Sequence, residues 1–427
     1  MSPAIGRLGL KLSDAVSAQT SLVQRLLDGV STIGADPPGI TRDAYGRGEN
    51  EAVGLIAEAG RALGLAASFD AGANLSLRWA SGRDAPPVLI GSHLDSIVQG
   101  GNFDGAAGVI AGIGAVAALQ AAGIAPRRDI EVLALRCEES VWFGLGLIGS
   151  RCLLAGLPEG ALELRHARSG LTLAQSIDSC GGDSARLREN TPLRDPRSLG
   201  AYLEVHIEQA PQLIEAGAPV AVCLANPGNV RHPFIRITGE DAHTGLPHRF
   251  RHDAPLAGAD LSLALERMWL EEEAQGRFMA VTIGRFHTPS ARHSMTAVSG
   301  GFELSLDLRA YSADHLVALE KRLGEIAAEV AARRKVEIVL GERSAAAPGP
   351  MDPDILKGLS AAAVRMGIAA PPLNSPGTHD ANNFVASGVP VGMLLVRNQN
   401  GSHNPYEAMD TPDLMAAIGV LAEYLAA

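Results

Sequence analysis

Four places in the sequence offer histidine or carboxylate residues at the ends of predicted buried strands. The first is Gly91-Ser92-His93-Leu94-Asp95 and the second is Glu138-Glu139, each directly after an apolar run. The third is Glu204-Val205-His206-Ile207-Glu208, and the fourth is Ser402-His403, just past another apolar run. Because ligands bind at the carboxyl ends of strands in α/β sheets, we expect these side chains to meet.

Five residues from these places and from the glycine-rich segment after the first could bind metal ions. Imidazole nitrogens and carboxylate oxygens together suit Zn, Mn or Co. One ion would be held by His93 and His206. A second would be held by Glu139 and His403, with Asp104 bridging the two ions. Taken singly, His93 also suits a structural histidine and Asp104 a helix N-cap, but four such strand ends are hard to explain by chance.

Two further carboxylates stand beside these candidate ligands. Asp95 follows His93 by two residues and would orient its imidazole from behind. Glu138 precedes Glu139, and adjacent carboxylates are costly unless a cation or a proton offsets their repulsion. The pair would also suit a loop exposed to solvent. The residues alone therefore leave open whether these carboxylates face a cation or water.

Alternating strands and helices must position these residues. Apolar runs predict buried strands at residues 87–91 and 129–135, with a buried helix at 105–122 between them, which indicates a parallel or mixed sheet covered by helices. After about residue 213 the order becomes strands, helix, strands, helix, typical of an α+β arrangement. We therefore predict a discontinuous domain of residues 1–213 and 335–427, interrupted by an insert of residues 214–334.

Composition excludes several classes of protein. The 36 Lys+Arg against 47 Asp+Glu give a formal charge of −11, whereas phosphate binding requires clustered basic residues. The chain contains no apolar run of about 18 residues that could span a membrane. Four cysteines without a C-x-x-C pair indicate a reducing compartment, and the N-terminus lacks an export signal. We expect a cytoplasmic protein that binds neither nucleic acid nor membranes.

Longer motifs resemble the amidase/hydantoinase/carbamoylase family of dinuclear metallohydrolases. That family includes N-carbamoyl-L-amino-acid hydrolases, allantoate amidohydrolases and β-ureidopropionases, and it belongs to the zinc aminopeptidase-like superfamily. The matching stretches occur in order along nearly the whole chain. They are GSHLDSIVQGGNFDG (91–105), EES-x-W-F (138–143), IGSR (148–151), YLEVHIEQ (202–209), AHTG with RHDA (242–254), LDLR (306–309), THDANNF (378–384) and GSHNPYE (401–407).

The resemblance implies a three-layer, zinc-exopeptidase-like α/β catalytic domain with an inserted α+β (ferredoxin-like) lid domain that forms a homodimer. It implies that the five residues above bind two divalent ions (Zn, Mn or Co) per subunit. It also implies that Glu138 is the general base and that His243, in the lid, stabilises the oxyanion. A water bridging the ions would attack as hydroxide, and Glu138 would transfer its proton to the leaving nitrogen.

Substrate contacts are where the sequence departs from the family pattern. Gln209 and Arg309 match residues that contact the polar end of the substrate, and arginine suits a carboxylate, although Arg309 also suits an exposed strand position. Thr296 replaces an asparagine that is usual before this arginine. His379, another expected substrate contact, follows a threonine where glycine is usual. The loop after His243 is one residue shorter than usual.

These observations predict a metal-dependent amidohydrolase that cleaves a linear carbon–nitrogen bond in a small carboxylated substrate, such as an N-carbamoyl amino acid or a related ureido compound. The alternatives are a dipeptidase, an N-acyl-amino-acid amidohydrolase or a hydrolase of another small amine or amide, all using the same site. A catalytically inactive relative would have lost a ligand or the base, whereas all six candidate residues are present.

Overall fold

The computed structural model describes residues 10–427, which form two compact units. The first unit contains the described residues up to Asn226 together with Pro350–Ala427, and the second is Pro227–Gly349. The extreme N-terminus, where no export signal is predicted, lies outside the described residues. Within residues 10–427, no helix combines the length and the apolar character needed to cross a membrane.

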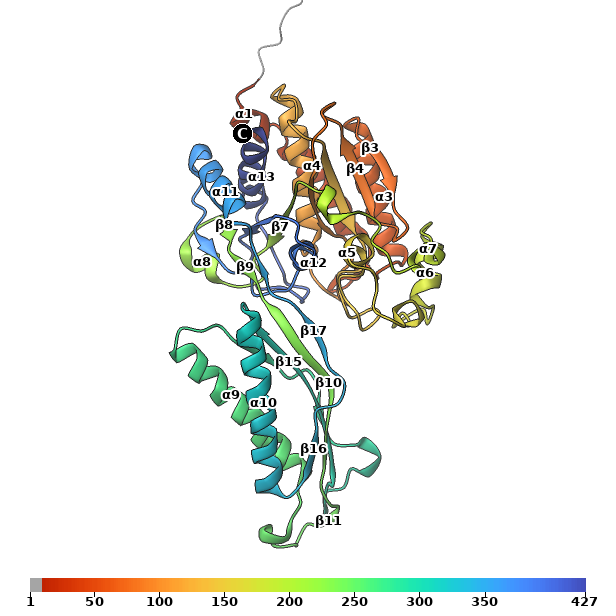
Figure 1. The fold of residues 1–427 in the computed structure, drawn as a ribbon, viewed down its shortest axis with the longest axis vertical. Helices are drawn as coiled ribbons and strands as arrows, with labels where there is room; N and C mark the ends of the chain where they lie inside the picture. Colours follow the sequence, from red (N-terminus) through yellow and green to blue (C-terminus); the bar gives the residue numbers. More distant parts are fainter. Residues whose placement is uncertain (1–9) are drawn as a thin grey trace, which may run out of the picture. The chain divides into compact units, whose positions relative to one another are not determined.

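An eight-stranded mixed sheet forms the centre of the first unit (Figure 1). Its four central strands, β20, β7, β5 and β6, run parallel, so their carboxyl ends lie at one edge of the sheet. In spatial order the strands are β19 (Pro372–Leu373), β8 (Val220–Cys223), β20 (Val391–Val396), β7 (Ala201–Ile207), β5 (Val88–His93), β6 (Ile130–Leu135), β4 (Leu75–Trp79) and β3 (Ala66–Phe69).

Alternate residues of the central strands enter two separate cores, one on each face of the sheet. In β7, for example, Leu203 and Val205 pack into one core and Tyr202 into the other. The first core is covered by α1 (Leu12–Ser17), α2 (Thr20–Thr32), α3 (Arg47–Ala62), α4 (Ala106–Ala121), α11 (Pro353–Met366) and α13 (Thr411–Ala426). The second is covered by α5 (Ile148–Leu154), α8 (Gln212–Ala216) and α12 (Ala381–Ala386). The predicted α/β fold is therefore confirmed.

Helix α4 lies directly against the backbone of the sheet. A Cβ atom at Gly108 would lie 2.0 Å from the carbonyl oxygen of Val205 in β7, so only glycine permits this approach. The helix contains no charged residue, and all of it except its last two residues is buried. Because α4 begins just after Asp104, this packing holds that carboxylate at the edge where the parallel strands end.

Shorter elements complete the first unit. The segment between β6 and β7 packs around the buried rings of Trp142 and Phe143. The remaining elements of the first unit are β1 (Ala35–Asp36), β2 (Gly39–Ile40), η1 (Ala161–Glu163), α6 (Leu173–Ser179), α7 (Ser184–Leu187), η2 (Pro196–Ser198) and β9 (Ala225–Asn226), and β18 (Gly349–Pro350) begins at the last residue of the second unit.

The second unit is an antiparallel sheet with two long helices packed on one face. Alternate residues of its central strand β15, such as Leu304, Leu306 and Leu308, are buried against these helices. The sheet contains β12 (Ala280–Thr282), β15 (Gly301–Ala310), β10 (Gly228–Thr238), β16 (Glu337–Val339), β13 (Phe286–His287) and β17 (Ser344–Ala346). The other elements are α9 (Ala254–Ala274), α10 (Ala313–Arg334), η3 (His248–Phe250), η4 (Ser290–Arg292) and the paired strands β11 (Ala242–His243) and β14 (Ala297–Val298).

The second unit begins and ends later in the chain than the predicted insert of residues 214–334. Strand β8 belongs to the large sheet, because it pairs with β20 and its apolar side chains enter the cores of the first unit. Strands β16 and β17 instead pair with β10 in the second unit. The apolar patterns predict strands near these positions, but they do not show which sheet each strand joins.

Candidate metal centre

The five predicted ligands come from the loops and strand ends at one edge of the large sheet. His93 is the last residue of β5, and His206 lies near the end of β7. Glu139 follows β6, His403 follows β20, and Asp104 precedes α4. All except His403 are buried, with at most 6% of their surface exposed. The parallel arrangement of the strands therefore brings together residues that are far apart in the sequence.

Asp104 lies between two groups of ligand atoms. Its Oδ1 atom is 3.0 Å from His206 Nε2 and 3.5 Å from His93 Nε2. Its Oδ2 atom is 3.4 Å from His403 Nε2, which is 3.2 Å from Glu139 Oε1. Donor atoms around a tetrahedral ion with bonds of about 2.0–2.1 Å are separated by roughly 3.3 Å, so both groups have a suitable size. The arrangement fits two neighbouring cations with Asp104 between them.

The state of His206 supports metal binding. Its Nδ1 atom lies 2.9 Å from the carbonyl oxygen of Ile207, which places the ring hydrogen there. Its Nε2 atom is buried and makes no hydrogen bond, although it faces Asp104. A buried polar atom without a hydrogen bond is costly, and a metal ion would satisfy the lone pair on Nε2.

The electrostatics of the cluster also favour a cation. Burial alone would lower the pKa of His403, but the carboxylates of Asp104 and Glu139 raise it to about 11. Burial would raise the pKa of Asp104, but the surrounding imidazoles lower it well below its usual value. The raised pKa of His403 follows from carboxylates that stabilise positive charge at this position, and a divalent ion would compete with the proton there.

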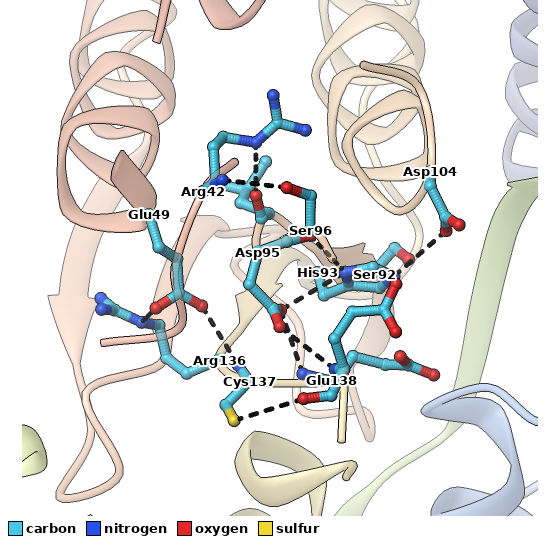
Figure 2. A network of polar contacts seen from close by, with 12 residues as sticks. Arg42, Glu49, Ser92, His93, Asp95, Ser96, Asp104, Arg136, Cys137 and Glu138 are labelled. Atoms are coloured by element: carbon cyan, nitrogen blue, oxygen red, sulfur yellow. Dashed lines mark hydrogen bonds and ion pairs between the residues drawn. The ribbon is translucent and has the colours of Figure 1, made fainter. Parts of the chain in front are cut away.

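Asp95 and Glu138 occupy a second layer around the ligands (Figure 2). Asp95 lies 3.4 Å from His93 Nδ1 and accepts hydrogen bonds from the backbone N–H groups of Glu138 (3.0 Å) and Glu139 (3.1 Å). Burial raises the pKa of the Glu138 carboxyl well above its usual value, His93 opposes this shift, and Glu139 adds to it. A raised pKa makes a carboxylate better suited to take up a proton and return it.

The comparisons with known proteins agree with this geometry. A model of peptidase family M20/M25/M40 matches residues 89–427. The chain belongs to this family. Members of the family depend on metal, and the predicted family relationship is confirmed.

Curated relatives and similar solved structures match nearly the whole chain. The protein is 33% identical over 405 residues to an N-carbamoyl-L-amino acid amidohydrolase of Geobacillus stearothermophilus, covering 94% of this chain and 96% of the relative. It is 29% identical over 438 residues to a ureidoglycolate hydrolase of Arabidopsis thaliana, covering 99% and 89%. A hydantoinase/carbamoylase family amidase from Burkholderia multivorans has a TM-score of 0.83 at 26% identity, covering 98% of each chain.

Gln209 and His379, two predicted substrate contacts, lie beside the ligands of this M20 centre. The Gln209 amide donates a hydrogen bond to Asp104 Oδ2 at 2.8 Å. The His379 ring lies 4.2 Å from the His206 ring, centroid to centroid, and its Nε2 atom is 2.7 Å from Ser375 Oγ. Both side chains therefore lie beside candidate ligands, and their contact with a substrate stays a prediction.

The other predicted substrate and oxyanion residues belong to the second unit. His243 in β11 is exposed and pairs with Ala297 in β14. Thr296 is the residue directly before Ala297. Arg309 lies near the end of β15 and donates a hydrogen bond to Asp307 at 3.1 Å. The roles of His243, Thr296 and Arg309 stay predictions.

Three residues near the centre were not predicted from the sequence. Glu407 accepts hydrogen bonds from the backbone N–H groups of Phe103 (2.8 Å) and Asp104 (3.1 Å). The Ser402 hydroxyl lies 2.6 Å from both Asp104 Oδ2 and Glu407 Oε2. The only feature of the sequence that could have indicated Ser402 and Glu407 is their position in the GSHNPYE segment beside His403. Glu49, which accepts a hydrogen bond from the backbone N–H of Cys137, has no such signal.

Proposed function

We propose that this M20 protein is a metal-dependent amidohydrolase that cleaves a linear carbon–nitrogen bond in a small carboxylated substrate. The observation that carries the proposal is the placement of Asp104 between two sets of nitrogen and oxygen ligands, with Glu138 beside them. His93, Asp104, Glu139, His206 and His403 would hold two divalent ions (Zn, Mn or Co). When bound, such ions lower the pKa of a water molecule and polarise a carbonyl group.

The protein residues supply proton transfer and orientation. Glu138 would accept a proton from the attacking water and deliver it to the leaving nitrogen. Asp95 fixes Glu138 and Glu139 through their backbone N–H groups. In this proposal His243 donates to the oxyanion, and Gln209, Thr296, Arg309 and His379 contact the substrate. An arginine in this set suits a substrate carboxylate, because its guanidinium can donate two parallel hydrogen bonds.

The most suitable substrate is an N-carbamoyl amino acid or a related ureido compound. Relatives named as N-carbamoyl-amino-acid amidohydrolases and ureidoglycolate hydrolases support this class. One similar solved structure, of AtUAH, contains (S)-hydroxyglycine, a small carboxylate (TM-score 0.82, 27% identity). The replacement of the usual asparagine by Thr296 keeps dipeptides and N-acyl amino acids as alternative substrates.

A substrate panel tests the proposal directly. Purified protein would be loaded separately with Mn, Co or Zn and given N-carbamoyl amino acids, allantoate, ureidoglycolate, N-acyl amino acids and dipeptides. We expect turnover of a ureido compound to exceed that of any dipeptide. Preferred cleavage of dipeptides would establish the peptidase alternative, and no turnover of any compound would contradict the proposed activity.

The role of Glu138 has its own test. We expect Glu138→Gln to lower kcat by about 10²–10⁴-fold, because the amide cannot take up the proton. Metal content, measured by elemental analysis, should remain at two ions per chain. Glu342→Gln, on an exposed segment of the second unit, is the control and should retain kcat. Near-normal kcat in Glu138→Gln would show that another group accepts the proton.

A homodimer formed through the second unit is part of the same proposal, and the cytoplasmic location stays a prediction. Sedimentation velocity of the full chain would detect the dimer. A species with the mass of a single 44.4 kDa chain at all concentrations would contradict it.

A further inference from the structure

The turn that presents Glu138 has an unusual backbone conformation. Cys137, between the end of β6 and Glu138, has a φ angle of +54°. A residue with a side chain adopts this left-handed conformation only where the surroundings hold it there. The conformation of Cys137 therefore requires contacts that fix it.

Two buried carboxylates hold this turn (Figure 2). The backbone N–H of Cys137 donates to Glu49 Oε1 at 3.1 Å. The N–H groups of Glu138 and Glu139 donate to the two carboxylate oxygens of Asp95, at 3.0 and 3.1 Å. Consecutive N–H groups in such a turn form a concave site for an anion, and here side chains of the same protein supply the negative charge.

Glu49 is held in turn by Arg136. The Arg136 Nε atom lies 2.6 Å from Glu49 Oε2, and both residues are almost completely buried. Arg136 also donates to Asn50 and lies 5.0 Å above the ring of Tyr45. Burial raises the pKa of Glu49 to about 7, against the effect of the Arg136 guanidinium. The guanidinium therefore helps to keep the acceptor of the Cys137 N–H group negatively charged.

We propose that the buried Glu49–Arg136 ion pair positions Glu138 by holding the left-handed turn at Cys137. The inference rests on the proposed function, because it takes Glu138 as the general base. Glu49 and Arg136 act through the backbone of the turn and are positioning residues. A displacement of about 1 Å of a reacting group can cost about 100-fold in rate, so the turn's geometry controls proton transfer.

The alternative is that the ion pair only stabilises the first unit, and a double substitution separates the two roles. Replacing a buried ion pair by apolar residues of similar size is often neutral for stability. Glu49→Leu with Arg136→Met therefore removes the acceptor of the Cys137 N–H group while the unit remains folded. We expect kcat to fall about 10- to 100-fold at an unchanged KM and unchanged metal content.

A control ion pair is available near the start of β6, the strand that ends just before Arg136. Glu131 in β6 is buried and pairs with Arg194 at 2.6 Å, and its side chain accepts hydrogen bonds from Ser76 and Arg194. Glu131→Leu with Arg194→Met should leave kcat within about twofold of the wild type. The single variant Arg136→Lys retains both Glu49 and a positive charge beside it. Its kcat should therefore be closer to that of the wild type than to that of the double variant.

A measurement that does not depend on activity completes the test. Amide hydrogen exchange at residues 137–139 should accelerate about tenfold in the Glu49/Arg136 double variant and remain unchanged in the control pair. Unchanged exchange, or a kcat within about twofold of the wild type, would overturn the inference. If the double variant does not fold, Glu49→Gln is used. Glu49 Oε2 accepts from both Arg136 Nε and the backbone N–H of Tyr45, so the glutamine oxygen should stay there and its NH₂ group, which cannot accept, would face the Cys137 N–H. If the wild type hydrolyses nothing, the proposed function fails, but amide exchange still tests the positioning role.

Discussion

The carboxylate of Asp104 has different neighbours on its two oxygen atoms. Oδ1 faces the imidazoles of His206 and His93. Oδ2 faces His403 and accepts hydrogen bonds from Gln209 and Ser402. These contacts fix the rotation of the carboxylate plane before any ion binds, so little reorganisation is needed when a metal enters.

The Ser402 hydroxyl offers a direct test of this arrangement. Removing it in Ser402→Ala frees Asp104 Oδ2 to rotate, and we expect metal affinity to fall about 10- to 100-fold. Competition with a fluorescent chelator would measure the change. Ser360→Ala, on the exposed face of α11, is the control and should bind metal normally. An unchanged affinity in Ser402→Ala would mean that Gln209 alone orients the carboxylate.

The sequence predicts the candidate ligands better than the residues that hold them. Four of the five ligands share a local signal, because His93 and His206 lie at the ends of apolar strands and Glu139 and His403 follow such strands. Asp104 lies instead in the glycine-rich segment before α4. The supporting contacts have no such signal: Ser402 and Asp104 are 298 residues apart, and Glu49 and Cys137 are 88 apart. Such pairings arise from the order of strands in the sheet, which a single sequence does not reveal.

At the scale of elements, the close contact between α4 and β7 fixes Asp104 relative to His206. We expect Gly108→Ala to destabilise the first unit by about 2–4 kcal/mol, because the added methyl group would collide with the carbonyl oxygen of Val205. Gly54→Ala in α3 is the matched control, since a Cβ there meets no atom within 4 Å. In urea unfolding, the Gly54→Ala control should be more stable than the wild type by about 0.5–1 kcal/mol. Equal stability of the two variants would contradict this packing argument.

Helices α9 and α10 are joined by a charged contact with a defined pH dependence. Arg277 donates two hydrogen bonds to Glu272, and His315 Nε2 lies 2.8 Å from the same carboxylate. These contacts lower the pKa of Glu272 below its ordinary 4.5. The folded state therefore binds fewer protons, so the stabilisation is present above about pH 4.5 and is lost as pH falls through the lowered pKa.

Glu272→Gln should remove this stabilisation. At pH 7 we expect the variant to lose about 1–2 kcal/mol in the free energy of unfolding of the second unit, and at pH 3 the difference should shrink. Hydrogen exchange in α10 would report the change. The exposed neighbour Glu273, changed to Gln, should have little effect at either pH. A difference that grew in acid would contradict the assigned sign.

Element prediction succeeded where a pattern is local. The apolar segment at 105–122 predicts α4, and the strand-like runs predict β5, β6 and β7. The predicted insert of residues 214–334 includes β8, which pairs with β20 in the large sheet. Its four buried residues give no indication of which strand they pair with. Partner choice depends on long-range contacts, and it determines where one unit ends and the next begins.

At the scale of the whole molecule, the charge of −11 includes the carboxylates of Asp104 and Glu139 at the centre. Removing the metal with a chelator should therefore lower the free energy of unfolding of the first unit. The expected loss is about 2.7 kcal/mol, compared with protein in the presence of free metal ion at 100 times its Kd. Hydrogen exchange should accelerate near residues 93–104 and 138–139, but not in α9 and α10. Asp104→Ala serves as the control, because a protein that binds no bridging ion should not respond to chelator. An equal response in both proteins would contradict the site.

The division of the first unit into two chain segments has a consequence for biosynthesis. During translation, His93, Asp104, Glu139 and His206 are made before the second unit, whereas β20 and His403 are made after it. The ligands around Asp104 Oδ1 are thus synthesised together, and those around Oδ2 are complete only after residue 403 has left the ribosome. The order of synthesis makes one half of the centre available to a metal ion earlier than the other.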